Sequence, residues 1–250
     1  MKFILAASSL ALATGAAART FIVKNNCAYT VWPAIYTMPG GANPPTSQPN
    51  GWEADAGTSV TFDVPDNWSS GRIWGRNGCD ASGNCVTGGC TGGIVCTGIG
   101  AAPQTLAEFT LTAYSNLDFY DISVVDGFNI PMSITTDQSS CTEASCPVDL
   151  NAICPAELKG PTAADGTVDG CNSACLANLD GTPNNSNNCC SGSFNTAATC
   201  PVSGVQDYSF FKNNCPNSYC YPFDESSNTA VWACSGTLNP TYTITFCPAS

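Results

Sequence analysis

The sequence predicts a mainly β protein, a β-sandwich held together by disulfide bonds. Residues 105–132 alternate apolar and polar side chains as paired strands do, and they contain no cysteine. Strand-like alternation is also found at 19–33, near the beginning, and at 241–246, near the end. The other long segments are crowded with cysteine, glycine or proline, which favours loops closed by disulfides.

The first eighteen residues have the layout of a secretory signal peptide. Lys2 precedes an apolar run from Phe3 to about Ala13, and small residues follow from Thr14 to Ala18, so we expect cleavage after Ala18. The apolar run is too short to span a bilayer, and no later stretch approaches about twenty uninterrupted apolar residues. We therefore expect a secreted protein, located outside the cell or in the cell wall.

All 17 cysteines lie after the expected cleavage point. Such a density in an exported chain indicates disulfides rather than metal sites or reactive thiols, because the secretory route is oxidising. The odd number means that one thiol is left over or pairs outside the chain. Each bridge stabilises a fold by ~2–4 kcal/mol in favourable cases, so many bridges predict a protein that is hard to unfold.

Charge and composition exclude several classes of partner and of catalysis. Without Lys2, 6 basic and 19 acidic residues give a formal charge of −13. Nucleic acids and anionic membranes are bound through Lys and Arg, so neither is expected as a partner. The absence of histidine excludes Ser-His-Asp and Cys-His catalysis and most catalytic zinc sites. We expect no metal and no cofactor, so carboxylates, Arg, Tyr and Lys must carry any polar chemistry.

The first part of the chain reads as strands separated by loops. Strands are predicted at 19–33, 58–64 and 71–76, where β-branched and aromatic residues alternate with polar ones. Residues 38–51 are rich in Pro, Gly and Asn and predict a loop. Residues 78–100 contain four closely spaced cysteines and little apolar content, which predicts small disulfide-closed loops. Their glycines do not match a nucleotide-binding motif.

In the central stretch, the alternation also predicts the direction of the side chains. If the alternate apolar residues of 107–111 and 120–124 face the core, Glu108 and Asp121 face away from it. Asp126 belongs to an Asp-Gly turn signal between DISVV and FNIPM. Asp121 and Asp126 are five positions apart, so a straight strand would point their side chains to opposite faces. The two can reach one groove only because Asp126 lies at the turn.

Residues 141–215 have a different character, with many Cys, Asn, Ser and Gly residues and few apolar runs. This composition predicts a loop-rich subdomain that depends on its bridges more than on a core of its own. Strand patterning returns at 230–233 and 241–246. Short helical pieces are predicted at 156–160, 173–179 and 205–213.

Two N-glycosylation sequons begin at Asn67 and Asn184. Both fall in predicted loops, where a glycan can be attached. An unused sequon is an equally good reading of the residues, so we leave the occupancy of both sites open.

Many motifs of the chain, in order, resemble those of the thaumatin-like proteins of the pathogenesis-related-5 type. They include NNCAYTVWP, GRIWGRNGC, LAEFTL, DFYDISVVDGFNIPM, NNCCSG, FFKNNCP and YTITFCP. The resemblance covers about residues 20–248, and the style of the sequence suggests a fungal member. It implies a flattened β-sandwich core at about 19–77, 100–140 and 216–250. A small disulfide loop at about 78–99 and a cysteine-rich subdomain at about 141–215 would flank this core.

By the order of the cysteines, the resemblance also implies eight disulfides. Cys220 has no counterpart in the family, so we predict a buried free thiol there. The implied pairs are Cys27–Cys247, Cys79–Cys85, Cys90–Cys96, Cys141–Cys234, Cys146–Cys215, Cys154–Cys171, Cys175–Cys189 and Cys190–Cys200.

The family has an acidic cleft, and its motifs place five residues of this chain there. Arg72 and Asp224 are the expected substrate-binding residues, and Glu108, Asp121 and Asp126 the expected catalytic ones. Cleavage of a glycosidic bond needs a protonated acid and an ionised carboxylate, for which we assign Glu108 as the acid and Asp121 or Asp126 as nucleophile or base. Without the resemblance, we would interpret these carboxylates as a solvated strand face with a salt bridge to Arg72. The neighbours Asp118 and Glu225 stand in second rank.

The resemblance implies two alternative functions. The first is a monomeric, secreted endo-β-1,3-glucanase or β-glucan-binding protein that acts on fungal cell-wall glucan. The second is a non-enzymatic defence or stress protein, either antifungal or an inhibitor of a protease or amylase. Tyr29, Trp32, Trp74 and Tyr120 are candidates for stacking on sugar rings, although packing in the sandwich explains most of them better.

Overall fold

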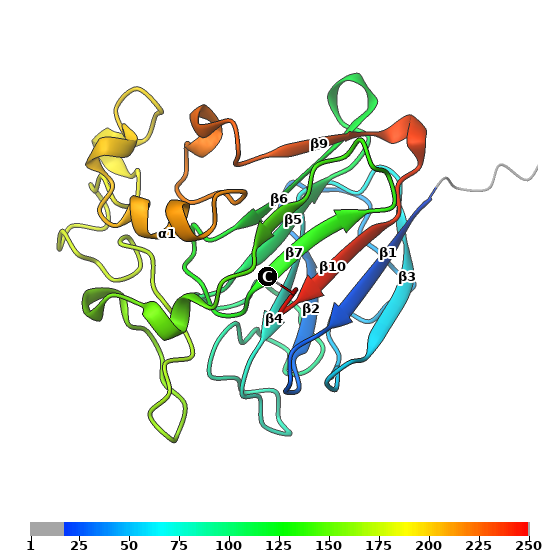
Figure 1. Ribbon diagram of the computed structural model, residues 1–250, viewed down its shortest axis with the longest axis horizontal. Helices are drawn as coiled ribbons and strands as arrows, with labels where there is room; N and C mark the ends of the chain where they lie inside the picture. The colour runs from blue at the N-terminus through cyan, green and yellow to red at the C-terminus, as the bar shows by residue number, and fades with distance from the viewer. Residues whose placement is uncertain (1–17, 250) are drawn as a thin grey trace, which may run out of the picture.

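The computed structural model describes residues 18–249, so the expected signal peptide lies outside the described residues except for Ala18. Two five-stranded sheets form a sandwich, which confirms the predicted fold class (Figure 1). The first sheet has the order β3-β1-β10-β7-β8, with β1 (Ala18–Asn25), β3 (Ser59–Pro65), β7 (Met132–Thr136), β8 (Ala144–Cys146) and β10 (Tyr242–Phe246). The second has the order β2-β4-β5-β6-β9, with β2 (Trp32–Thr37), β4 (Gly71–Arg76), β5 (Leu106–Thr110), β6 (Leu117–Ser123) and β9 (Trp232–Ser235).

The strands pair antiparallel except for the first and last, β1 and β10, which run parallel. Aromatic side chains fill the space between the sheets: the rings of Phe21 and Phe109 meet edge to face with centroids 4.8 Å apart. Trp68 and Tyr242 are fully buried against them. The predicted inward set of the central stretch therefore forms the core, and this fixes the outward direction of the residues between.

The strand predicted at 19–33 is two strands in different sheets. β1 ends at Asn25 and β2 begins at Trp32. The side chain of Asn25 causes the break, because its oxygen accepts from the Cys27 N–H at 2.9 Å and its amide donates to the Tyr29 carbonyl at 2.8 Å. This local bonding closes a turn where the apolar alternation alone suggested a continuous strand.

The predicted turn at Asp126-Gly127 is present. Gly127 has a φ of +86° and donates to the Val124 carbonyl at 3.0 Å. The chain then crosses to the first sheet, where Met132 begins β7. The segment after the turn pairs through Phe128 with Cys171 of the cysteine-rich subdomain instead of returning along β6.

Residues between β8 and β9 are mostly turns, loops and short helices, and Figure 1 shows this part of the chain beside the sandwich. β8 lies within the predicted cysteine-rich subdomain at about 141–215, but it is a strand of the first sheet. The one α-helix among the described residues, α1 (Tyr208–Asn214), falls where a helical piece was predicted. Residues 173–179 form turns rather than the predicted helix, because Asn178 takes a left-handed φ of +52°. The part of the chain that the structure describes also contains seven 3-10 helices: Tyr114–Asn116, Leu150–Ile153, Ala156–Leu158, Gly192–Phe194, Val202–Gly204, Asp224–Ser227 and Gly236–Leu238. In the described part of the chain, none of the helices has the length and apolar character to cross a bilayer.

Eight disulfides bind the structure, and they join the eight pairs that the resemblance implies. The bridge between Cys27 and Cys247 ties together two segments 220 residues apart in the sequence. Cys220 is the free cysteine among residues 18–249, and it is 5% exposed.

Titration with a thiol reagent is expected to find no reactive thiol in the native protein and one after denaturation without reductant. Cys220 is buried, and burial raises the pKa of its thiol to about 12, so the reactive thiolate is scarce at neutral pH. A Cys220→Ser variant serves as the control, because it should show no thiol in either state. Finding no thiol in the denatured wild type, or a disulfide-linked dimer, would contradict this assignment.

The small disulfide loop packs on the outer face of the second sheet. The buried guanidinium of Arg76 donates to the carbonyls of Gly93 at 2.9 Å, Ile94 at 2.8 Å and Trp32 at 2.9 Å. Trp74 Nε1 donates to the Gly88 carbonyl at 2.8 Å. These bonds fix the loop over one end of β4, and the other end of the strand is left open.

Candidate functional site

Three charged residues lie side by side across the second sheet. Arg72 of β4 is directly opposite Glu108 of β5, and Glu108 is directly opposite Asp121 of β6. The residues that flank them in each strand face the buried core. Because side chains alternate along a strand, all three point away from the sandwich on the same face. The predicted outward direction of Glu108 and Asp121 matches this arrangement.

Arg72 and Glu108 form an ion pair, with Nε and Oε1 2.6 Å apart. Their side chains are 22% and 28% exposed, so both stay accessible from solvent. A pair of this kind at a surface contributes at most about 1 kcal/mol to stability. Its position in the middle of an outer sheet face is therefore not explained by a need for stability.

The row lies at the bottom of a depression that extends in both directions. On one side a hollow of about 380 Å³ extends past Met38 and Phe119. On the other side a hollow of about 250 Å³ extends past Tyr219 and Pro222 to Asp126. Arg72, Glu108 and Asp121 line both hollows, so the two form one continuous surface. We call this surface, with Asp126 at its end, the acidic trough.

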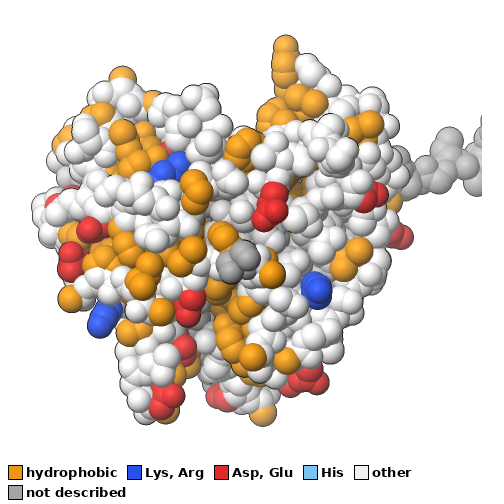
Figure 2. Space-filling model, viewed as in Figure 1, with side chains coloured by type: hydrophobic (Ala, Val, Ile, Leu, Met, Phe, Trp, Pro, Cys, Tyr) orange, Lys and Arg blue, Asp and Glu red, His pale blue; other side chains and the backbone are white. Residues whose placement is uncertain are grey.

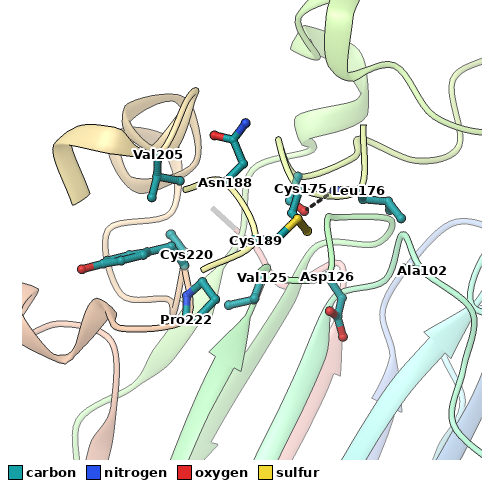
Figure 3. Close-up of a pocket in the computed structure, with 12 residues that line it drawn as sticks. Ala102, Val125, Asp126, Cys175, Leu176, Asn188, Cys189, Val205, Cys220 and Pro222 are labelled. Atoms are coloured by element: carbon teal, nitrogen blue, oxygen red, sulfur yellow. Dashed lines mark hydrogen bonds between the residues drawn. A yellow bond between two sulfur atoms is a disulfide. The ribbon is translucent and has the colours of Figure 1, made fainter. Parts of the chain in front are cut away.

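Beyond Asp126 the trough meets a third hollow of about 300 Å³, against the cysteine-rich subdomain (Figure 3). Its lining is mostly apolar, with Leu176, Val205 and the Cys175–Cys189 disulfide on one side and Val125 on the other. The carboxylate of Asp126 points away from the disulfide in this view (Figure 3). Asp126 therefore stands at the boundary between the charged trough and the apolar hollow.

The two neighbouring carboxyls of the trough have different surroundings. Asp121 has a buried oxygen, Oδ1, without a hydrogen-bond partner. Burial, reinforced by the charge of Glu108, raises the pKa of Asp121 well above its usual range. Burial also raises the pKa of Glu108. The Arg72 charge opposes the shift of both carboxyls, but only Glu108 also accepts a hydrogen bond from Arg72. Asp121 is therefore the carboxyl that more readily holds a proton.

The structure also brings Asp126 to the same site. Its charge is among those that raise the pKa of Glu108. The Val124–Gly127 turn places it there, as expected for two residues that a straight strand would point to opposite faces. Four of the five expected cleft residues thus line one trough.

Asp224 was expected to be a substrate-binding residue of the cleft, but it lies apart from the other four residues. It is 1% exposed and does not line the trough. Its carboxylate accepts from Tyr208 OH at 2.7 Å, from Lys212 Nζ at 3.1 Å and from the Cys220 N–H at 3.0 Å. These contacts attach the segment after Cys220 to α1, so Asp224 supports one wall of the trough from behind.

The second-rank residues have separate positions. Asp118 is fully buried and pairs with Arg19, so it has no part in the trough. Glu225 accepts a hydrogen bond at 2.6 Å from the hydroxyl of Tyr219, which lines the trough. Sequence reasoning missed Tyr219, because it lies in a cysteine-rich segment without strand patterning and carries no charge.

The remaining predicted surface features are distributed over the molecule. Trp74 and Tyr120 are 1% exposed and cannot stack on a ligand, whereas Tyr29 and Trp32 reach the surface away from the trough. Asn67 and Asn184 are exposed, so both sequons are accessible. In residues 18–249 no cluster of His, Cys, Asp or Glu has the arrangement of a metal site.

Comparison with known proteins identifies similar chains. The family model described as "Thaumatin family" matches residues 25–248. The protein "Glucan endo-1,3-beta-glucosidase" of Prunus avium is 42% identical over 260 residues, which is 99% of this chain and 100% of the relative. "Pathogenesis-related thaumatin-like protein 3.8" of Cryptomeria japonica is 44% identical over 91% of this chain and 88% of its own. Both are plant proteins, so the expectation of a fungal member gains no support from them.

Among solved structures, the "thaumatin-like xylanase inhibitor TLXI" is 24% identical and covers 91% of this chain and 99% of its own. Its TM-score is 0.46.

Proposed function

Since this chain belongs to the thaumatin family, we propose that it is a secreted protein that binds β-1,3-glucan of fungal cell walls and slowly hydrolyses it. The row of Arg72, Glu108 and Asp121 at the bottom of an open trough is the observation that carries this proposal. The name of the Prunus avium relative, which matches over the whole chain, supports the choice of glucan. We place the protein outside the cell or in the wall, as a monomer.

The surroundings of the two carboxyls favour the reverse of the roles assigned from sequence. Asp121, with its raised pKa and unpartnered oxygen, is the better proton donor. Glu108 is held beside the Arg72 guanidinium, which favours its ionised form. We therefore assign Asp121 as the general acid and Glu108 as the nucleophile.

The chemistry then follows the two-step route of a retaining glycosidase. The Asp121 proton goes to the glycosidic oxygen as its bond to the anomeric carbon breaks, and a Glu108 oxygen bonds to that carbon. Water then displaces Glu108, and the Asp121 carboxylate takes the proton of that water. Arg72 orients the nucleophile, and Asp126 contacts a neighbouring sugar unit.

The retaining route is part of the proposal. Glu108 and Asp121 are directly opposite on neighbouring strands, so their Cβ atoms are about 4.5–5.5 Å apart. Their carboxyl groups must lie about 5–5.5 Å apart for retention, whereas inversion needs about 6.5–9.5 Å to admit a water. The anomeric configuration of the first sugar released from laminarin tests this choice.

Incubation of the protein with laminarin is expected to release reducing sugar, and Glu108→Ala is expected to abolish this release. The variant removes the proposed nucleophile but keeps the strand, so the protein should still fold. Asp63→Asn, on an exposed position of β3, is the control for the loss of one negative charge and should retain activity. Equal release from wild type and Glu108→Ala would show that the trough is not a catalytic site.

A pull-down on insoluble β-1,3-glucan tests binding separately from hydrolysis. We expect the wild type to be retained and Arg72→Ala/Glu108→Ala to be retained weakly. Retention without any release of sugar would leave a non-enzymatic glucan-binding protein. If the wild type is not retained, the glucan proposal is wrong and the inhibitor alternative becomes the one to test.

A further inference from the structure

A second groove, of about 530 Å³, lies on a different part of the surface and shares no lining residue with the acidic trough. It is bounded by the β1–β2 loop with Tyr29, by Asn77 where the small disulfide loop begins, and by residues 163–169 of the cysteine-rich subdomain. The molecule is hollowed at the lower edge of the view in Figure 2, with acidic atoms along its left side. Elsewhere on this face the acidic side chains are scattered (Figure 2).

Two aromatic side chains form one wall of the groove. Tyr29 is 44% exposed, and Trp32 is partly exposed at the start of β2. Buried side chains fix the backbone of both: Asn25 donates to the Tyr29 carbonyl at 2.8 Å and Arg76 to the Trp32 carbonyl at 2.9 Å. Partly exposed rings on a fixed backbone offer flat apolar surface to a ligand at a small cost in conformational entropy.

The opposite wall is rich in acceptors and poor in positive charge. Asp149, Asp165 and Asp169 line it, and no Lys or Arg is among its lining residues. Burial, and then the charges of Asp165 and Asp149, raise the pKa of Asp169. Asn151 Oδ1 is buried at the groove without a hydrogen-bond partner. A ligand that fits must bring hydrogen-bond donors and positive charge.

A bare metal ion does not meet these requirements. Within residues 18–249, the three carboxylates do not form a group that could hold a metal ion. A metal ion would also leave the two aromatic rings without a contact. An organic cation with an apolar face would contact the rings through that face and the carboxylates through its charge.

We propose that this groove binds an amino sugar, a unit of a polysaccharide whose amino groups are free and protonated. The apolar face of the sugar ring would stack on Tyr29 and Trp32. Its ammonium group would donate to Asp149 and Asp169, and a hydroxyl to Asn151 Oδ1. This site is independent of the glucan trough, so one molecule could attach to two wall polymers of different chemistry.

Calorimetric titration with a glucosamine tetramer, at 0.15 M salt to screen non-specific attraction, tests the proposal. The fully N-acetylated tetramer and laminaritetraose are the neutral comparisons, and we expect both to bind at least about tenfold more weakly, because the carboxylates have no cation to meet. Asp149→Asn/Asp169→Asn and Tyr29→Ala should each weaken glucosamine binding by about tenfold. Asp63→Asn/Glu143→Gln removes the same charge from exposed positions elsewhere and should leave binding unchanged.

Three results would overturn the proposal. Equal binding of the three tetramers would show that the ammonium group is not recognised. Equal weakening by the groove variant and the Asp63/Glu143 control would show general charge attraction only. Spermidine binding as tight as glucosamine binding, with no effect of Tyr29→Ala, would show an ammonium site without sugar recognition. Glu108→Ala should not affect this titration, so failure of the glucan proposal can be told apart from failure of this one.

Discussion

Replacing Asp118 with Asn is expected to lower the free energy of unfolding by about 3–5 kcal/mol, because it leaves the buried charge of Arg19 uncompensated. Asp118 is fully buried, and its Oδ2 accepts from Arg19 Nε at 3.0 Å and from Tyr242 OH at 3.0 Å. Its Oδ1 accepts from the Thr112 N–H at 2.8 Å. One carboxylate thus joins β1 and β10 of the first sheet to β6 of the second.

Denaturation by guanidinium with the disulfides intact measures this effect, with Asp63→Asn as the exposed control. The double variant Arg19→Met/Asp118→Leu should recover part of the loss, since an apolar pair carries no unpaired charge. Recovery should be incomplete, because Thr112 N–H and Tyr242 OH would lose their acceptor. If Asp118→Asn unfolds within about 0.5 kcal/mol of the control, the pair does not hold the sheets together as described.

The outward direction of the carboxylates in the trough could be predicted from the sequence, because the alternation of side chains along a strand is a local property. Once Phe109 and Tyr120 are placed in the core, Glu108 and Asp121 must face the other way, and the structure has them so. What alternation cannot provide is register. That Arg72, Glu108 and Asp121 stand in one row depends on which residues of three strands pair, and a shift by one residue would turn one of them inward.

The disulfide pairs followed from the family resemblance, but hydrogen bonds and ion pairs between segments far apart in the sequence could not be predicted. Alternation places Asp118 on the same face as Tyr120, toward the core and opposite to Asp121, but it does not identify the partner of a buried carboxylate. Only the packing of Arg19, 99 residues away, against it makes one carboxylate structural. In the same way, the motif around Asp224 gave no sign that Lys212 of α1 would bind its carboxylate.

A substitution of Asp121 by Asn is expected to reduce hydrolysis of laminarin by about 10²–10⁴-fold, the range that a general acid contributes. The wild-type rate should fall as pH rises through the pKa of the coupled pair, because the acid must hold its proton. Asp121→Asn should lose this pH dependence together with the activity. A variant that retains wild-type turnover would exclude Asp121 as the acid.

The same substitution should make the protein more stable at neutral pH. The pKa of Asp121 is higher in the folded state than in the unfolded state, so the favourable contribution of the protonated carboxyl is fully present below the unfolded value of about 4. It is lost as pH rises through the folded value, where an ionised carboxylate must be kept buried beside Glu108. Asn carries no such charge, so the difference in unfolding free energy between Asp121→Asn and wild type should grow from pH 3.5 to pH 7.

Asn also supplies an N–H donor, which can donate a hydrogen bond to a Glu108 oxygen. Glu108→Gln would instead leave Arg72 without its ion-pair partner, so it should stabilise the protein less. Unfolding curves at the two pH values test this prediction. A gap that does not widen with pH would show that the pKa of Asp121 is not raised in the folded protein, and the assignment of Asp121 as the general acid would lose its basis.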